Sequence, residues 1–263
     1  ETQPFGHTKK NLLRDPMPFS SPVITTAAAL LEAFQHGHRH FRGIRLHRPD
    51  LSGVHLPGID LTGAWLMGVD FTGSSLSGAI LNGAHLEGAL IWEARLLRAQ
   101  LLGADLQGSQ LNGSLLREAQ LVGANLSQAT LMGTDLTGAV LIGANLSGSH
   151  LQAVPAESAV VMLAGTLRAN LLIEQEPHLI TQFVGCDLSG ANFAGACLNW
   201  ADFTGADLRG ANFQSTQAQG INLCGAALRG VNFEGANLAG AYYDADTYWD
   251  PEFNPMDWGM VRM

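Results

Sequence analysis

Large apolar residues recur at every fifth position over most of the chain. From Phe41 to Leu151 all 23 positions in this register are Leu, Ile or Phe, and 13 further positions run from Phe183 to Tyr243. We call these residues the centres. A small or apolar residue stands two positions before most centres, and 27 of the 31 glycines stand two positions after one. A period of five fits neither an α-helix nor an ordinary β-strand.

The five-residue period predicts a coiled chain made of very short strand segments. A centre and the residue two before it point to the same side of an extended segment, so both are expected to face inward. The glycine that follows permits a sharp corner. Repeated corners wind the chain into a solenoid whose coils stack about 4.8 Å apart, and each buried Leu contributes ~1.5–3 kcal/mol.

The register between the two blocks is degenerate. Extending the first block gives Ala156, Val161, Thr166 and Leu171 as further centres, and the phase is lost only at EQEPHLITQ, residues 174–182. We interpret this stretch as a surface bulge within one continuous solenoid, because the spacing on either side of it is otherwise kept.

Four repeats show the pattern most clearly: ANLSQ, TDLTG, ADLQG and ANFAG. They resemble the A(D/N)LXX signature of the pentapeptide repeat family, over about residues 39–245. The resemblance implies an all-β solenoid, a right-handed quadrilateral β-helix with four repeats per coil, and 40 centres then give about ten coils. The expected segments are an extended N-terminal arm (1–24), a capping helix (25–38), a first solenoid block (39–173), the bulge (174–182), a second block (183–245) and a C-terminal aromatic cap (246–263).

Both ends of the solenoid are predicted to be capped, because an open coil would expose its core. Thr25 or Thr26 is a suitable N-cap and Gly37 a suitable stop, so a short helix is expected to cover the first coil with Leu30, Leu31 and Phe34. The lead-in and the tail resemble the caps of cyanobacterial members of the family. The aromatic residues of the tail are expected to cap the last coil or, in addition, to form a homodimer contact: Tyr242, Tyr243, Tyr248, Trp249, Phe253 and Trp258.

One outward face carries apolar residues where most other repeats have polar ones. With four sides per coil, centres twenty residues apart share a face, and the face of Leu61 to Val161 has an apolar stripe: Ile80, Leu102, Val122, Val140, Ile142, Val160 and Met162. Such a stripe is typical of a contact surface. Three interpretations stay open: another protein binds it, the N-terminal arm covers it, or the face is miscounted. Trp92, with Leu90 and Leu97, is expected to widen it from adjoining sides.

Composition and charge weigh against several other functions. The net charge of −9 is unfavourable for nucleic-acid binding, and no apolar run is long enough for membrane insertion. Cys186, Cys197 and Cys224 are irregularly spaced, which fits a reducing, cytoplasmic compartment better than a disulfide framework or a zinc site.

No residue pattern indicates catalysis or a cofactor. His36, His38 and His40 invite comparison with a metal site, but they lack nearby Cys or paired carboxylates and are interpreted as solvated cap residues. The family signature accounts for the aspartates that precede centres, and the glycines form corners rather than a phosphate-binding loop. A filled solenoid also offers no natural pocket. We therefore expect no enzyme activity and no cofactor.

The sequence favours a non-enzymatic scaffold or adaptor that binds another protein, or a multi-protein complex, through its apolar face. The caps make a cyanobacterial assembly or regulatory complex the expected setting. The alternative is a DNA-mimicking protein that binds DNA gyrase, as some members of the family do. That function requires a densely acidic surface, whereas most outward positions here are neutral.

Overall fold

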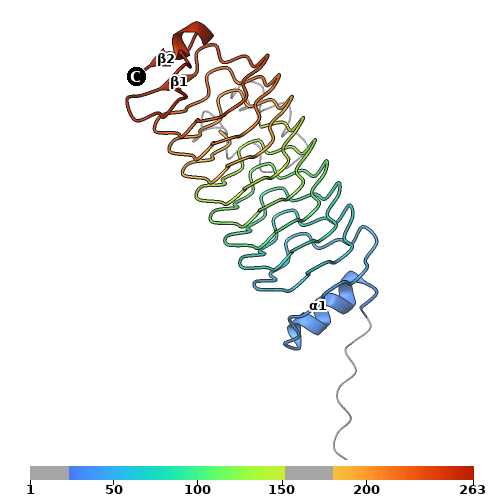
Figure 1. Ribbon diagram of the computed structural model, residues 1–263. Coiled ribbons are helices and arrows are strands. Elements are labelled where there is room, and N and C mark those ends of the chain that lie inside the picture. The colour runs from blue at the N-terminus through green and yellow to red at the C-terminus, as the bar shows by residue number, and fades with distance from the viewer. Residues whose placement is uncertain (1–23, 152–179) are drawn as a thin grey trace, which may run out of the picture.

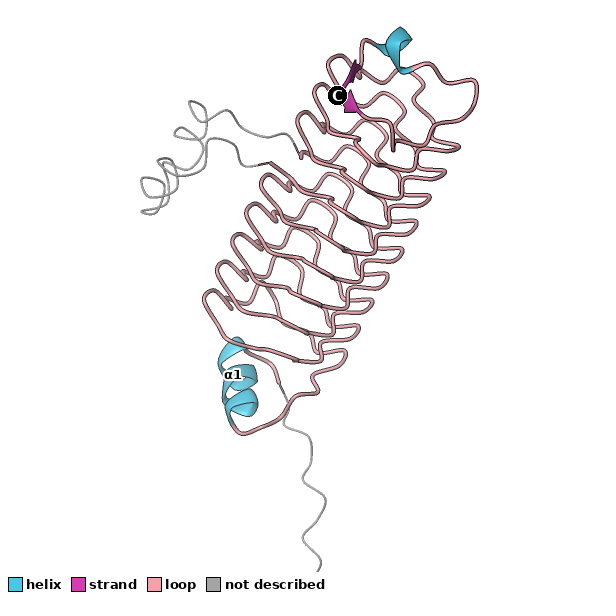
Figure 2. Ribbon diagram, turned by 90° about the vertical axis from the view of Figure 1, so that its left-hand side faces the viewer, coloured by secondary structure: helices cyan, strands magenta, loops and turns pink. Residues whose placement is uncertain are grey.

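The chain forms an elongated solenoid of stacked coils (Figures 1 and 2). The computed structural model describes residues 24–151 and 180–263. Parallel bridges join each coil to the next, with partners 20 residues apart in the first block, as in His40 with Asp60 and Asp60 with Ile80. These bridges confirm a solenoid built from the five-residue repeat.

Each coil has four sides, since four centres occur in every 20 residues. Side A contains the centre Phe41, side B Leu46, side C Leu51 and side D Leu56, and each side continues with the centre of every following coil. The sides follow one another in chain order, so A lies opposite C, and B lies opposite D. The residues just before and just after each centre form two columns of side chains on every side.

The interior is filled by the centres. All of those from Phe41 to Leu151 are at most 5% exposed. In the second block the rings stack from coil to coil: the centroids of Phe183 and Phe203 are 4.7 Å apart. Apolar burial of this extent stabilises a chain whose many glycines carry a large entropic penalty on folding.

The corners confirm the role predicted for glycine. The 27 glycines at the described corners all have φ between 61° and 72°, a region that residues with a Cβ disfavour. Seven described residues other than glycine have a positive φ, and all of them stand in the same position two residues after a centre: Arg48, Glu93, Arg98, Glu118, Gln128, Trp200 and Ser215. The coil therefore imposes this geometry whichever residue is present.

The two blocks stack directly on one another, which corrects the predicted number of coils. Asp135 pairs with Gln182, and His150 pairs with Cys197. The coil that ends at Leu151 is therefore followed in the ladder by the coil that begins at Gln182. With 36 centres at four per coil, the described part of the chain has nine coils of repeats rather than about ten.

The number of coils predicted from sequence was too high because the degenerate repeats were counted as a coil. An Ala or Thr centre buries much less apolar area than a Leu and so stabilises a coil less. The centres predicted at 156, 161, 166 and 171 lie outside the described residues, as do residues 174–179 of the predicted bulge. The bulge was also predicted to extend too far. Thr181 is fully buried and Gln182 belongs to the ladder.

A ladder of side-chain amides runs along side B. Asn125 Nδ2 donates to Asp105 Oδ1 at 3.0 Å, and Asn145 donates to Asn125 at 3.1 Å. Asn192 donates to Asn145 at 3.3 Å, so the ladder crosses the junction between the blocks before it continues through Asn212 and Asn232. Each asparagine oxygen also accepts a bond from the backbone N–H two residues on.

Helix α1 (Ala27–Gln35) covers the first coil, as predicted. Thr26 is its N-cap and accepts a 3.1 Å bond from the backbone N–H of Ala29. Leu30 and Phe34 are buried beneath it, while Leu31 is half-buried. Of the predicted arm, residues 1–23 lie outside the described residues. Within the described ranges, no helix has the length and apolar character needed to cross a membrane.

The other end is closed by the aromatic tail. Strands β1 (Tyr242–Tyr243) and β2 (Val261–Arg262) pair in parallel, with the 3-10 helix η1 (Pro255–Trp258) between them in sequence. Trp249, Phe253 and Trp258 all contact the ring of Phe233. The tail therefore packs against the end of the solenoid within one chain. Tyr248 stays 61% exposed, and the homodimer contact stays a prediction.

Candidate protein-docking surface

The predicted apolar stripe lies on side A. Bridges link Ile80 to Val140 through two glutamines in the column before the centres. Leu102, Val122 and Ile142 follow one another in the column after the centres, where successive corner N–H groups bond their carbonyls. Leu102 is 42% exposed and Ile142 is 40% exposed, whereas Ile80, Val122 and Val140 are half-buried. Val160 and Met162 lie outside the described residues.

Trp92 does not adjoin this stripe, contrary to the prediction. Trp92 stands in the column just after the centres of side C, and its carbonyl accepts a hydrogen bond from the backbone N–H of Gly73. Side C lies opposite side A. The indole N–H donates to Gln110 at 2.9 Å, and the ring is half-buried. Leu90 is also on side C. Only Leu97, on side D, borders side A.

Two leucines on side D, the side that precedes side A of the following coil, are exposed as well. Leu97 is 39% exposed and Leu115 is 41% exposed, and they come from successive coils. Leu115 was not predicted from the sequence, because the prediction followed the outward residues of one side and left out those of the neighbouring side. We define the apolar docking surface by five residues from sides D and A: Leu97, Leu102, Leu115, Val122 and Ile142.

An ion pair occupies the corner inside this surface. Arg98 Nε lies 2.6 Å from a carboxylate oxygen of Glu118 in the next coil. Arg98 lowers the pKa of Glu118, and Glu118 raises the pKa of Arg98. Both residues have a positive φ, 55° and 57°, where almost every other corner has glycine. A strained conformation of this kind costs ~1–3 kcal/mol per residue, and such strain is commonly found at functional sites.

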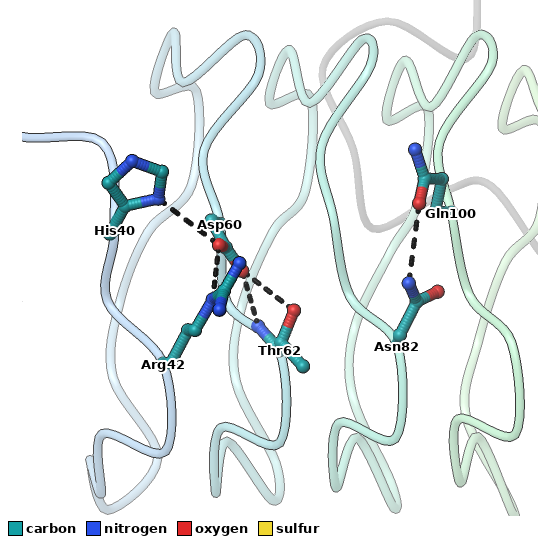
Figure 3. A network of polar contacts seen from close by, with 6 residues as sticks. All are labelled: His40, Arg42, Asp60, Thr62, Asn82 and Gln100. Atoms are coloured by element: carbon teal, nitrogen blue, oxygen red, sulfur yellow. Dashed lines mark hydrogen bonds and ion pairs between the residues drawn. The ribbon is translucent and has the colours of Figure 1, made fainter.

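Hydrogen bonds fix the polar start of side A (Figure 3). Asp60, which is 1% exposed, accepts bonds from Arg42 at 2.6 Å and from the Thr62 hydroxyl at 2.7 Å, and it contacts His40 at 3.2 Å. Burial alone would raise the pKa of Asp60, but the bonds from Thr62, Arg42 and His40 outweigh it and lower the pKa. This end of the side is therefore rigid.

Two amides continue this polar network toward the apolar docking surface. Asn82 Nδ2 donates to Gln100 Oε1 at 3.3 Å (Figure 3). Asn82 Oδ1 in turn accepts the backbone N–H of Leu102 at 2.9 Å. These contacts hold the backbone of the first strongly exposed apolar residue on side A.

The described residues do not assemble a metal site, since they contain no group of three or more potential ligands. His36 Nδ1 contacts the carbonyl of Glu32 at 2.8 Å, and His38 is exposed. Cys186 is buried, and desolvation raises the pKa of its thiol to about 12, so this thiol fills space in the core and stays protonated. Cys197 and Cys224 are half-buried thiols.

A shallow cavity of about 370 Å³ lies on side A near the C-terminal end. Asp207, Arg209, Arg229 and Tyr248 line it. Arg209 is bound to Asp207 and lowers the pKa of that carboxyl, so this acid is held as a carboxylate by its neighbour. The lining contains no nucleophile paired with a base, and no chemistry follows from it.

Five stretches of the sequence match the pattern described as pentapeptide repeats: residues 44–83, 79–117, 114–152, 181–210 and 206–242. The chain belongs to the pentapeptide repeat family. Its fold is the right-handed quadrilateral β-helix of that family. The matches to the pentapeptide repeat pattern stop at residue 152 and resume at 181, in agreement with the direct stacking of the two blocks.

Several solved pentapeptide repeat structures are similar to the chain. HetL, involved in heterocyst differentiation regulation in Nostoc sp. strain PCC 7120, is 26% identical over 82% of this chain and 96% of its own, with a TM-score of 0.38. Rfr23 from Cyanothece 51142 is 30% identical over 51% and 66%, with a TM-score of 0.21. QnrB1, a plasmid-mediated fluoroquinolone resistance protein, is 20% identical over 75% and 87%, with a TM-score of 0.46. No curated protein matches the chain.

Proposed function

We propose that this pentapeptide repeat protein is a non-enzymatic scaffold that binds another protein through the apolar docking surface. The observation that carries the proposal is the column of apolar side chains at Leu102, Val122 and Ile142 in three successive coils, with Leu97 and Leu115 exposed on the neighbouring side D. Leu97, Leu102, Leu115 and Ile142 are each about two-fifths exposed, yet they come from coils that follow one another along the axis. Scattered exposed apolar residues are ordinary, whereas a contiguous group is typical of a contact surface.

The rigidity of the coils supports the proposal. Each of these side chains is attached to a backbone that is bonded to the coils on both sides, as at Leu102 and Leu115. A surface that is already ordered loses little conformational entropy when a partner binds. The Arg98–Glu118 pair adds a charged element that gives a partner orientation as well as attraction.

DNA mimicry has little support in the described surface. The longest polar column, on side B, consists of asparagines that satisfy one another by amide hydrogen bonds, so it carries little charge. The buried carboxylates Asp60 and Asp135 are bound by Arg42 and Arg117. Neither feature forms the dense row of free negative charge that imitates a phosphate backbone.

Affinity capture from a native lysate of the source organism tests the proposal. The bait is the wild type or the Leu102→Asp/Ile142→Asp variant, and the matched control is Gln107→Asp/Gln219→Asp, with both substitutions at exposed positions on sides B and C. We expect one protein to be lost from the docking-surface variant only, while circular dichroism is unchanged. Equal capture by all three baits would refute docking at this surface.

A further inference from the structure

The first coil differs in charge from the rest of the protein. Residues 36–55 hold four arginines and five histidines but a single acidic residue, although the chain as a whole has a net charge of −9. All nine of these basic or potentially basic side chains are exposed. Three of them gather at the start of side B and its corner to side C: Arg45, His47 and Arg48.

Two large apolar side chains lie in the next coil on the same side. Trp65 is 41% exposed and Met67 is 49% exposed, and they flank the buried centre Leu66. Arg45 stands in the same column as Trp65, one coil earlier. The Arg48 side chain lies over Gly68, and its Cγ is 3.1 Å from the point where a Cβ on Gly68 would be. Cations and apolar groups therefore share one patch.

Trp65 is held by its neighbours along the axis. The Arg45 guanidinium lies 4.7 Å from the centroid of the indole ring, and the His85 ring stacks on it at 4.1 Å with an interplanar angle of 28°. Because Arg45 comes from the preceding coil and His85 from the following coil, the two cover opposite faces of the ring. The ring edge is what faces solvent.

Neither of the two arginines in this patch has an acidic partner among the described residues. Arg42 is bound to Asp60 on side A, but Arg45 and Arg48 form no ion pair with any residue in 24–151 or 180–263. The carboxylate of Glu87, further along side B, lies 3.5 Å from His85. Exposed Trp and Arg side chains together are the composition of binding hot spots.

We propose that Arg45, His47, Arg48, Trp65 and Met67, here called the Trp65 patch, form a second docking surface, for an acidic polypeptide segment that also carries apolar side chains. Carboxylates of the segment pair with the two arginines, and its apolar groups cover the Trp65 edge and Met67. The residues of the Trp65 patch lie on side B in the first two coils, whereas the apolar docking surface begins at Leu97 in the third coil, so the two surfaces are separate. A protein with both surfaces can hold two chains at once.

Nucleic acid and anionic lipid fit the Trp65 patch less well. A base stacks on an open aromatic face, and both faces of Trp65 are occupied. Stable membrane attachment needs a large apolar insertion or a polybasic cluster. The patch offers two apolar side chains and two arginines that lack an ion pair within the described part of the chain, on a protein that is negative overall.

Selection from a displayed library of random peptides tests the proposal with defined probes. The full chain is immobilised as wild type, as Arg45→Glu/Arg48→Glu, and as Trp65→Ala. The matched control is Arg229→Glu/Arg262→Glu, two exposed arginines at the other end of the solenoid. The Leu102→Asp/Ile142→Asp variant separates this site from the apolar docking surface, and urea unfolding confirms that each variant is folded.

We expect the wild type to enrich peptides that combine Asp or Glu with apolar residues. Their binding should fall about tenfold or more in Arg45→Glu/Arg48→Glu and in Trp65→Ala, a factor that corresponds to ~1.4 kcal/mol, and it should weaken with added salt. It should be unchanged in the control and in the Leu102→Asp/Ile142→Asp variant. Failure of the first proposed function would leave this result intact.

Two outcomes would overturn the proposal. One is that enriched peptides are not acidic, or that none are enriched, or that acidic ones bind Arg45→Glu/Arg48→Glu as well as wild type. The other is that single-stranded DNA or phosphatidylserine vesicles bind in an Arg45- and Arg48-dependent way while acidic peptides do not. In that case the patch serves a phosphate-bearing ligand instead.

Discussion

Leu141 and Ile142 are adjacent in sequence, and the structure gives them opposite environments. Leu141 is a centre of side A with 0% exposure, while Ile142 is 40% exposed. Leu141→Ala should lower the free energy of unfolding by ~2–5 kcal/mol, because it removes buried methyl groups and leaves a cavity between coils that cannot collapse. Ile142→Ala removes a side chain that is partly in water already, so a loss of at most ~1 kcal/mol is expected.

Urea unfolding followed by circular dichroism measures both losses, with the slope of each curve compared with wild type, since repeat proteins can lose cooperativity when one coil weakens. Leu121→Ala and Val122→Ala, one coil earlier, repeat the comparison. Similar losses within each pair would refute the assignment of inward and outward positions. They would also show that the docking surface is covered by other parts of the protein.

Three further predictions concern corners, the amide ladder and the buried carboxylate. Gly220→Ala places a Cβ 2.3 Å from a tryptophan ring of the preceding coil, whereas Gly143→Ala meets nothing within 4 Å, so thermal unfolding should show a larger loss for Gly220→Ala than the ~1–3 kcal/mol of backbone strain common to both. Asn145→Ala breaks ladder bonds to two coils and should lose ~1–3 kcal/mol in urea titration, while Ser147→Ala on the same side should lose little; equal losses would contradict the ladder. Asp60→Asn should be less stable than wild type at neutral pH, with a difference that shrinks as the pH falls below ~4, because the pKa of Asp60 is lowered in the folded state and its contribution is lost on protonation; a difference that is constant with pH would contradict this.

The repeat itself could be predicted from sequence because a single pattern fixes several physical requirements together. A centre must be large and apolar to fill the coil, and the corner two residues later must tolerate a positive φ. Leu126 and the corner at Gln128, with φ 61°, show that the first requirement is kept even where the second is met by a residue other than glycine. The coil is thus specified by its centres.

The junction between the two blocks could not be predicted, because a five-residue period shows where a centre stands but not how well its side chain fills the coil. The four extra centres assumed between Leu151 and Phe183 make up one complete coil of four repeats. Their inclusion therefore changed the number of coils but left each later centre on its correct side. The five-residue register predicted for the second block is therefore confirmed, although the coil count was too high.

The exposed apolar residues on sides A and D were predicted only in part, since the extent of the group depends on the order of the sides around the coil. Columns on one side follow from a spacing of 20 residues, which is how Leu102 and Ile142 were found. Whether two sides adjoin or lie opposite depends on the order of centres within a coil. The prediction that Trp92 adjoins the apolar stripe did not use that order. Trp65 and Met67 were missed because burial by neighbouring coils sets their exposure, and the sequence does not show it.

The corner at Arg98 gives further support to the proposal that a partner binds the apolar docking surface. The side chain of a corner residue other than glycine extends toward the same corner of the next coil, as the Trp200 ring does toward Gly220. In six of the seven described cases the next coil has glycine there, which leaves room for it. Arg98 alone is followed by a second such residue, Glu118. Two adjacent corners therefore carry backbone strain, and an exposed ion pair contributes only ~0–1 kcal/mol in return. Stability gives no reason to keep this arrangement, whereas recognition of a partner at the centre of the apolar docking surface does.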